Sequence, residues 1–354
     1  MSIFRYNNVH IHTFGYELAP NVVSSEDIED RLDPLYKKIR VQKGQLESFT
    51  GIYERRFWDP GFKVSKGAVM AGKKAIEKSM IPENDIGMLI FAGVCRDNLE
   101  PATACAVADG LGLSGDTLVY DVSNACLGVL NGMIQVADAI ELGRIKAGIV
   151  VSCEASREIV ESTIERMLEN PTMDMFKDSV ATLTGGSGAV AVLLTNKTLA
   201  EASGESGGHR LTAGVVKNAS SFHKLCLWGP DAGPAYNGVQ IMKTDSVGVL
   251  QNGVALGMET YNAFKKATDW ANGQPDKVIC HQVGSAHQKT ILSSINISEG
   301  NDFTTYQYLG NIGTVSLPIT AAIAGEREFL KSGDRVGFFG IGSGLNCMML
   351  GIEW

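Results

Sequence analysis

The chain has 354 residues, of which 44% are hydrophobic and 20% charged, and 40 glycines are spread along it. This composition is typical of a compact α/β enzyme and excludes a fibrous or disordered chain. The formal net charge of −8 argues against nucleic acid as a partner, because no basic stripe offsets the repulsion of a phosphate backbone.

The N-terminal residues lack a basic segment followed by an apolar one, and no run of about 18 apolar residues occurs. We therefore expect a cytoplasmic protein without a membrane span. The seven cysteines are scattered and form no CxxC pair, so reduced thiols are expected. Cys280, His281 and His287 do not have zinc-site spacing, and neither a metal nor a cofactor is predicted.

The first half of the chain alternates strand-like and helix-like segments. Strands are predicted at 85–94, 118–122 and 146–155, with helices at 101–113 and 126–143 between them. This βαβαβ order predicts a parallel sheet flanked by helices. Residues 156–180 then interrupt the series with a mixed helical pattern.

A similar series returns in the second half. It consists of a strand at 276–283, helices at 285–295 and 314–333, and a terminal strand at 334–344. The segment at 196–210 between the halves is polar and rich in Gly and Ser. We therefore predict two related halves, residues 1–196 and 197–354, each built on a βαβαβ-type unit.

Cys126 stands between the strand at 118–122 and the apolar helical spacing that follows. At a helix N-terminus, unpaired N–H groups and the helix dipole favour a thiolate, which predicts a lowered pKa and a nucleophile. The alternative is a small buried hydrophobic residue. The other six cysteines lack this context and are interpreted as packing residues.

Four motifs occur in a characteristic order: YDVSNACLGVLNGM, ICHQVG, YLGNIGTVSLP and GIGSGLN. With them the chain resembles the thiolase superfamily, and more closely its β-ketoacyl synthase III branch. The resemblance covers nearly the whole chain. It implies a thiolase fold with a five-layered α-β-α-β-α core, a homodimer, and acyl-CoA or acyl carrier protein as partner.

The same resemblance assigns roles to individual residues. Cys126 would hold the first acyl group as a thioester, and His281 and Asn311 would donate hydrogen bonds to the enolate oxygen of the second substrate. Backbone N–H groups of Cys126 and near Ser343 would hold the other oxyanion. Taken singly, His281 would more often be structural and Asn311 a turn residue.

Glu100 lies 26 positions before Cys126, in CRDNLEPATACA. This stretch resembles the OleA family of olefin biosynthesis, whose members join two fatty acyl-CoA molecules head to head. A glutamate reaching across the dimer could remove an α-proton, where a malonyl unit would instead lose CO2. The alternative is a carboxylate at a helix entry before Pro101.

Three positions depart from the usual synthase III pattern. Phe49 replaces a basic residue before TGI, Gly284 replaces the asparagine of HQAN, and Gly186 stands where an acidic residue is common. Arg55 and Arg56 are candidates for contacts with the CoA phosphates, or a solvated surface pair. His287 is interpreted as a residue at the helix surface or outside the site.

The leading hypothesis is an acyltransferase that performs a non-decarboxylative Claisen condensation of two long-chain acyl-CoA molecules through acyl-Cys126. The first alternative is a decarboxylative β-ketoacyl synthase III that uses a malonyl thioester. An alternative of another class is an acyl-binding or thioesterase-like protein on the same scaffold.

Overall fold

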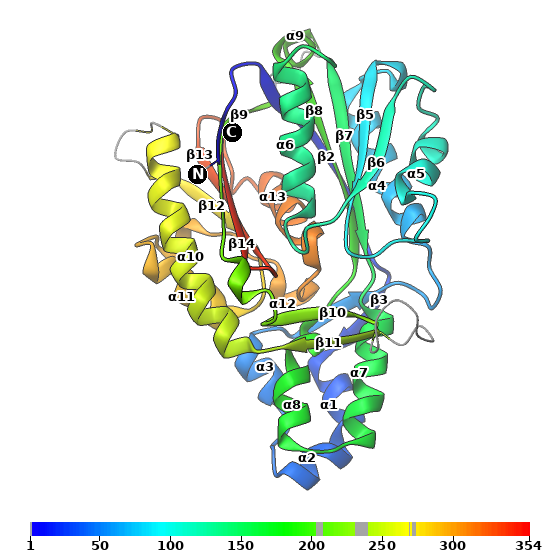
Figure 1. Ribbon diagram of the computed structural model, residues 1–354, viewed down its shortest axis with the longest axis vertical. Helices are drawn as coiled ribbons and strands as arrows, with labels where there is room; N and C mark the ends of the chain where they lie inside the picture. Colours follow the sequence, from blue (N-terminus) through cyan, green and yellow to red (C-terminus); the bar gives the residue numbers. More distant parts are fainter. Residues whose placement is uncertain (1, 203–207, 231–239, 269, 271–273) are drawn as a thin grey trace.

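The computed structural model describes residues 2–202, 208–230, 240–268, 270 and 274–354, and its large sheet consists of two half-sheets (Figure 1). The first half-sheet contains β2 (Val9–Leu18), β5 (Ile86–Ala92), β6 (Leu118–Val122), β7 (Ala147–Glu154) and β8 (Gly188–Asn196). The second contains β1 (Ser2–Arg5), β9 (His209–Asn218), β12 (Lys277–Cys280), β13 (Arg335–Gly342) and β14 (Asn346–Glu353). β2 and β9 join them through two residue pairs.

The two half-sheets share one pairing pattern. In the first, β5 runs parallel to β7, β7 antiparallel to β8, and β8 antiparallel to β2. In the second, β12 runs parallel to β13, β13 antiparallel to β14, and β14 antiparallel to β9. The predicted pseudo-symmetry is therefore confirmed, but the sheet is mixed rather than parallel. The boundary at residues 196 and 197 stays a prediction.

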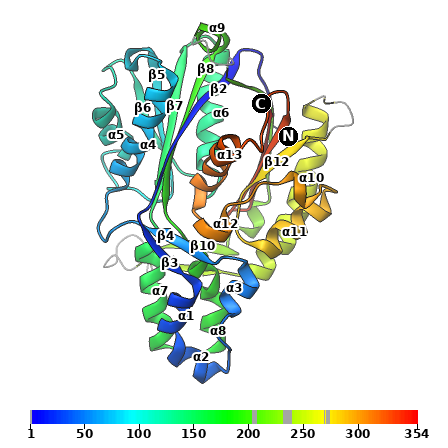
Figure 2. The ribbon, with the colours of Figure 1, turned by 180° about the vertical axis from the view of Figure 1, so that it is seen from behind.

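Helices complete five layers (Figures 1 and 2). α4 (Val64–Ser79) and α5 (Thr103–Leu111) cover the outer face of the first half-sheet. α10 (Ser246–Ala267) covers that of the second, beside α11 (Ser285–Ser294). α6 (Gly128–Glu141) and α13 (Ser316–Glu326) lie between the half-sheets. The α-β-α-β-α order agrees with the predicted thiolase fold.

Side-chain alternation explains this arrangement. In β7, Val150 faces the central cluster around α6, whereas its neighbours Ile149 and Val151 face α4. Successive strand residues point to opposite faces, so a strand covered on both sides reads as a continuous apolar run. α13 is buried from Ser316 to Ala324, as expected for a helix with apolar residues all round.

Two predicted boundaries in the second half are wrong. α13 ends at Glu326 rather than near 333, and the chain then turns so that Leu330 packs into the central cluster. β13 is not the terminal strand, because the chain reverses after Gly342 and returns as β14 beside it.

Helices α1 (Ser25–Arg31), α2 (Asp33–Ile39), α3 (Gln45–Thr50), α7 (Arg157–Glu169) and α8 (Met173–Ser179) form the lower end of the molecule in Figure 1. α7 and α8 confirm the helical pattern predicted at 156–180. The shorter elements are β3 (Asn21–Ser24), β4 (Glu54–Phe57), α9 (Lys197–Ala202), β10 (Cys226–Pro230), β11 (Gln240–Thr244) and α12 (Tyr306–Leu309).

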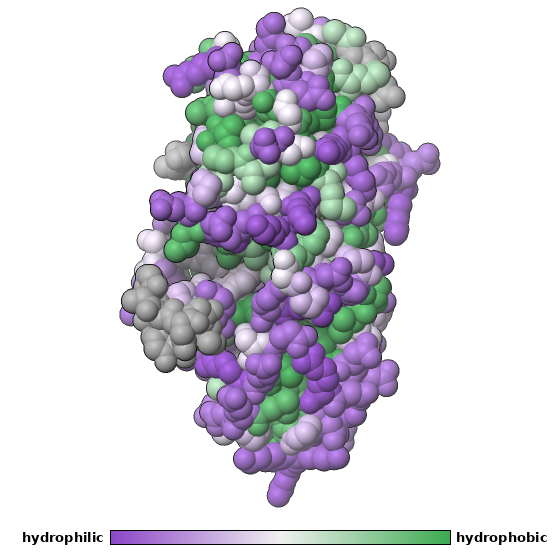
Figure 3. Space-filling model, turned by 90° about the vertical axis from the view of Figure 1, so that its right-hand side faces the viewer, coloured by the Kyte–Doolittle hydropathy of each residue, from purple (hydrophilic) through white to green (hydrophobic). Residues whose placement is uncertain are grey.

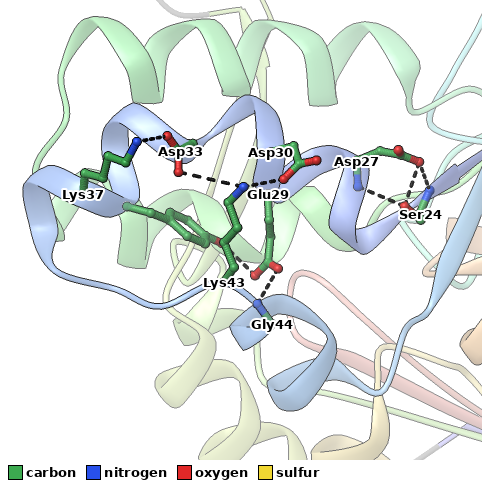
Figure 4. Close-up of polar contacts among 9 residues, drawn as sticks. Ser24, Asp27, Glu29, Asp30, Asp33, Lys37, Lys43 and Gly44 are labelled. Atoms are coloured by element: carbon green, nitrogen blue, oxygen red, sulfur yellow. Dashed lines mark hydrogen bonds and ion pairs between the residues drawn. The ribbon is translucent and has the colours of Figure 1, made fainter.

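A buried carboxylate orders this end of the molecule (Figure 4). Glu29 is 2% exposed and accepts hydrogen bonds from the N–H groups of Gly44, at 2.6 Å, and Leu46, at 2.8 Å. It thereby holds the start of α3. The neighbouring contacts of Lys43 and Lys37 with Asp30 and Asp33 lie at the surface, where ion pairs contribute little to stability.

β6 ends the sheet on the side viewed in Figure 3, where hydrophobic side chains gather in the upper part of the molecule. Leu118 at the start of β6 is 53% exposed, and Leu99, in the loop between β5 and α5, is 92% exposed. A strand edge that carries an exposed leucine is a surface suited to association. Among the described residues, no helix has the length and apolar character needed to span a membrane.

We predict that Gly186→Ala destabilises the fold by about 1–3 kcal/mol, the usual range for overpacking. A Cβ on Gly186 would lie 2.1 Å from the carbonyl oxygen of Leu309, so backbone atoms would have to move. Urea unfolding measures the change. Gly115→Ala is the matched control, because no atom lies within 4 Å of a Cβ there. Equal unfolding free energies for both variants would contradict the prediction.

Candidate active site

The turn between β6 and α6 presents Cys126. Ala125 has a positive φ of 45°, and α6 begins at Gly128, so Cys126 lies immediately before the helix. The amide of Asn124 donates to Asn131 Oδ1 at 2.7 Å and accepts from Asn346 Nδ2 at 3.2 Å. These bonds connect the Cys126 turn to the start of β14.

His281 and Asn311 are positioned through their backbones. His281 follows β12, and its N–H donates to Phe339 O at 2.8 Å. The N–H of Asn311 donates to Thr184 O at 2.8 Å, while its side-chain Oδ1 accepts from Gly313 N–H at 3.1 Å. Because Oδ1 is occupied, Nδ2 is the group that Asn311 offers to a ligand.

One cavity of about 330 Å³ brings together four of the predicted residues, Cys126, His281, Asn311 and Ser343. Much of its remaining wall is apolar and includes Val180, Met242, Val249, Leu250 and Ile341. Gly342 lies against the cysteine, since a Cβ there would stand 3.4 Å from the Cys126 nitrogen. A thiol and polar donors therefore converge in an apolar chamber.

Burial determines the protonation of this site. It raises the pKa of the Cys126 thiol to about 12, and the charges of Cys226 and Glu154 act in the same direction. The lowered pKa expected from the helix N-terminus is therefore wrong, because desolvation of the thiolate outweighs the helix contribution. Burial, followed by the neighbouring His287, lowers the pKa of His281 to about 3. Both side chains are neutral near pH 7.

The sequence interpretation missed two residues of the cavity wall, His287 and Cys226. His287 lies in the first turn of α11, and its buried Nε2 has no hydrogen-bond partner among the described residues. The available signal was its place in the predicted helix at 285–295, whose first turn follows the strand end that carries His281. Nothing local marked Cys226, which reaches the cavity from β10.

Gln282 is a supporting residue. It is 4% exposed, and its Oε1 accepts from the N–H groups of Thr305, at 2.7 Å, and Tyr306, at 2.8 Å. Its Nε2 donates to Phe303 O at 2.9 Å. Gln282 thus ties the strand end that carries His281 to the segment that leads into Asn311.

Glu100 is exposed and does not line the cavity of its own chain. It lies in the loop between β5 and α5, where its neighbours Asn98 and Leu99 are exposed as well. Within one chain, the structure therefore leaves Glu100 apart from Cys126, His281 and Asn311.

Arg55 and Arg56 do not line the cavity either. Arg55 is 0% exposed, donates to Ser25 Oγ at 3.0 Å, and has its pKa lowered to about 10 by burial. Arg56 is half-buried and donates to Ala19 O at 3.3 Å. A guanidinium without exposed surface cannot contact a nucleotide phosphate, so the position of Arg55 gives it an internal role.

The described part of the chain contains no cluster of three or more His, Cys, Asp or Glu residues that could hold a metal ion.

The fold and the cavity, with its cysteine, histidine and asparagine, have the arrangement expected of a thiolase-fold condensing enzyme. Comparison with known proteins extends this assignment. The family described as 3-oxoacyl-[acyl-carrier-protein (ACP)] synthase III C terminal matches residues 266–354.

The chain is 51% identical to the acyl-CoA:acyl-CoA alkyltransferase of Shewanella oneidensis, over 99% of this chain and 100% of that protein. It is 35% identical to the acyl-CoA:acyl-CoA alkyltransferase of Xanthomonas campestris, over 99% of both chains. Solved structures of Xanthomonas campestris OleA superpose with a TM-score of 0.91 at 34% identity, over 99% of this chain and 98% or more of theirs. One contains bound lauric acid and lauroyl-CoA. The chain belongs to the acyl-CoA:acyl-CoA alkyltransferase (OleA) family of thiolase-fold condensing enzymes.

We predict that iodoacetamide alkylates Cys126 slowly near pH 7, at a rate that rises about tenfold per pH unit without a plateau up to roughly pH 10. The reason is that the thiolate reacts, and burial raises the pKa of this thiol to about 12. Peptide mapping follows the adduct at Cys126, and Cys126→Ser gives the background labelling of the other free cysteines, of which Cys105 is exposed. A plateau below about pH 8 would show a stabilised thiolate instead.

Proposed function

We propose that the protein is an acyltransferase that condenses two long-chain acyl-CoA molecules without decarboxylation, giving a 2-alkyl-3-oxoacyl product. The observation that carries the proposal is the full-length similarity to acyl-CoA:acyl-CoA alkyltransferases, at 51% identity, in a chain with this cysteine cavity. The apolar wall suits an alkyl chain, and the neutral site suits a thioester. Acyl carrier protein is the alternative donor of the first acyl group.

In the first half-reaction, Cys126 Sγ attacks the carbonyl carbon of one acyl-CoA. The proton of the Cys126 thiol passes to the CoA sulfur as the bond between that sulfur and the acyl carbon breaks, so CoA departs as the thiol. Backbone N–H groups at Cys126 and around Ser343 hold the tetrahedral oxyanion. The contact between Gly342 and the Cys126 backbone supports this pairing of the two turns.

In the second half-reaction, Glu100 of the neighbouring subunit removes an α-proton from the second acyl-CoA. His281 Nε2–H and Asn311 Nδ2–H stabilise the enolate oxygen, and the α-carbon then attacks the acyl-Cys126 carbonyl, releasing Cys126. Solved variants of Xanthomonas campestris OleA replace one cysteine, one histidine and one glutamate. Their glutamate precedes their cysteine by 26 positions, as Glu100 precedes Cys126, which supports the assignment.

A homodimer is part of the proposal, because Glu100 lies outside the cavity of its own chain. The sheet edge at β6, with the exposed Leu118 at its start, supports association on that side. A cytoplasmic location, where acyl-CoA is available, is proposed with it.

Incubation with a long-chain acyl-CoA as the sole substrate tests the function. We expect free CoA and a β-keto product to form without a malonyl thioester. Product formed only with a malonyl thioester, together with CO2, would instead establish a decarboxylative synthase. Free fatty acid and CoA without a carbon–carbon bond would establish a thioesterase.

For Glu100 we predict that Glu100→Gln lowers condensation by about 10²–10⁴-fold, the usual contribution of a general base. Acylation of Cys126, followed by intact mass, should proceed at the wild-type rate, because that step needs no α-proton removal. Glu83→Gln, at an exposed position that does not line the cavity, serves as the control. Full condensing activity of Glu100→Gln would remove the base assignment and leave Cys126 as the nucleophile.

A further inference from the structure

Glu154 is a buried carboxylate at the end of β7 that the sequence did not single out. It is 3% exposed, and its two carboxylate oxygens accept separate backbone hydrogen bonds. Oε1 accepts from Val94 N–H at 3.0 Å, and Oε2 accepts from Cys95 N–H at 3.2 Å. These two residues begin the segment that leads to Glu100.

Further hydrogen bonds hold both ends of this segment. Cys95 Sγ lies 3.5 Å from Ala155 O and accepts from Ala155 N–H at 3.4 Å. At the other end of the segment, Asp121 accepts from the N–H groups of Thr103, at 2.9 Å, and Ala104, at 2.8 Å. Residues 96–101, here called the Glu100 arm, therefore run between two carboxylate clamps, and all of them except Asp97 are exposed.

Glu154 also lies beside its own subunit's site. A Cβ on Gly313 would stand 3.3 Å from Glu154 Cγ, so the carboxylate packs against the turn that follows Asn311. Its charge is one of the causes that raise the pKa of Cys126. The same side chain thus contacts the turn that follows Asn311 and the two residues from which the segment leading to Glu100 begins.

We propose that Glu154 is a positioning residue that acts in trans: it aims the Glu100 arm of its own subunit into the active site of the partner. This inference rests on the proposed function, in which Glu100 serves the neighbouring subunit. Backbone N–H groups bound to a buried carboxylate are held by strong, charge-assisted hydrogen bonds, and a small misplacement of a base lowers its rate steeply.

Glu154→Gln tests the clamp with little change of shape. An amide group has one acceptor oxygen, so one of the two N–H groups would face an N–H donor instead. We expect condensation to fall at least about tenfold while Cys126 acylation persists. Hydrogen exchange at residues 94–101 should accelerate. Thermal melting of the variant checks its folding.

Mixed dimers purified with two affinity tags identify the site on which Glu154 acts. In a dimer of one Glu154→Gln subunit and one Cys126→Ala subunit, only the Glu154→Gln subunit keeps Cys126, and its site receives the intact arm of the other subunit. About half of the wild-type condensing activity should therefore return. In the reciprocal dimer, one subunit carries both substitutions and the other is wild-type. There the only site that keeps Cys126 is in the wild-type subunit, and it receives the disturbed arm of the doubly substituted subunit. Condensing activity should therefore stay low.

The opposite pattern, with no rescue in the first dimer and rescue in the second, would overturn the proposal by placing the effect in the subunit's own cavity. A mixed dimer of Glu100→Gln with Cys126→Ala provides the separate test of arm sharing. Its activity should be about half of wild-type. Inactivity of this control dimer would overturn arm exchange itself, whereas acyl-CoA condensation by the wild-type protein would still stand.

Discussion

The packing of α6 and α13 between the two half-sheets is the constraint on which the site depends. The buried side chains of both helices are apolar and close-packed, as where a Cβ on Gly132 would lie 2.6 Å from Val150. The Cys126 turn and the Asn311 segment lead into the starts of these two helices. There Val129 N–H, in the first turn of α6, donates to Thr314 Oγ1 at 2.8 Å. The Cys126 turn and the Asn311 segment are consequently fixed to each other.

A site at the end of a dry central layer acquires unusual acid–base properties. Desolvation disfavours the charged form of each group, which raises the pKa of Cys126 and lowers that of His281. The resting cavity is therefore neutral. In such a site, hydrogen-bond donors aimed at a developing oxyanion are worth more than they would be in water, because no solvent has to reorganise during the reaction.

Buried carboxylates provide the second organising device. Glu29 holds the start of α3, whose Phe49 and Thr50 line the cavity, and Glu154 holds the root of the Glu100 arm. Each binds two backbone N–H groups of a segment that has little core of its own. Burying such a charge is costly, and the paired hydrogen bonds offset that cost while specifying one conformation of the segment.

By itself, the sequence predicted the strand and helix order of residues 85–155, the thiolase fold through its motifs, and Cys126, His281 and Asn311 as a candidate set, which the structure places on one cavity. Side-chain periodicity is a local property, and the motifs retain their order along the chain. The return of β14, the burial of Arg55, the raised pKa of Cys126 and the positions of His287 and Cys226 on the cavity wall were decided only by the tertiary structure. Each depends on how segments distant in the chain pack together and exclude water, and no local pattern records that environment.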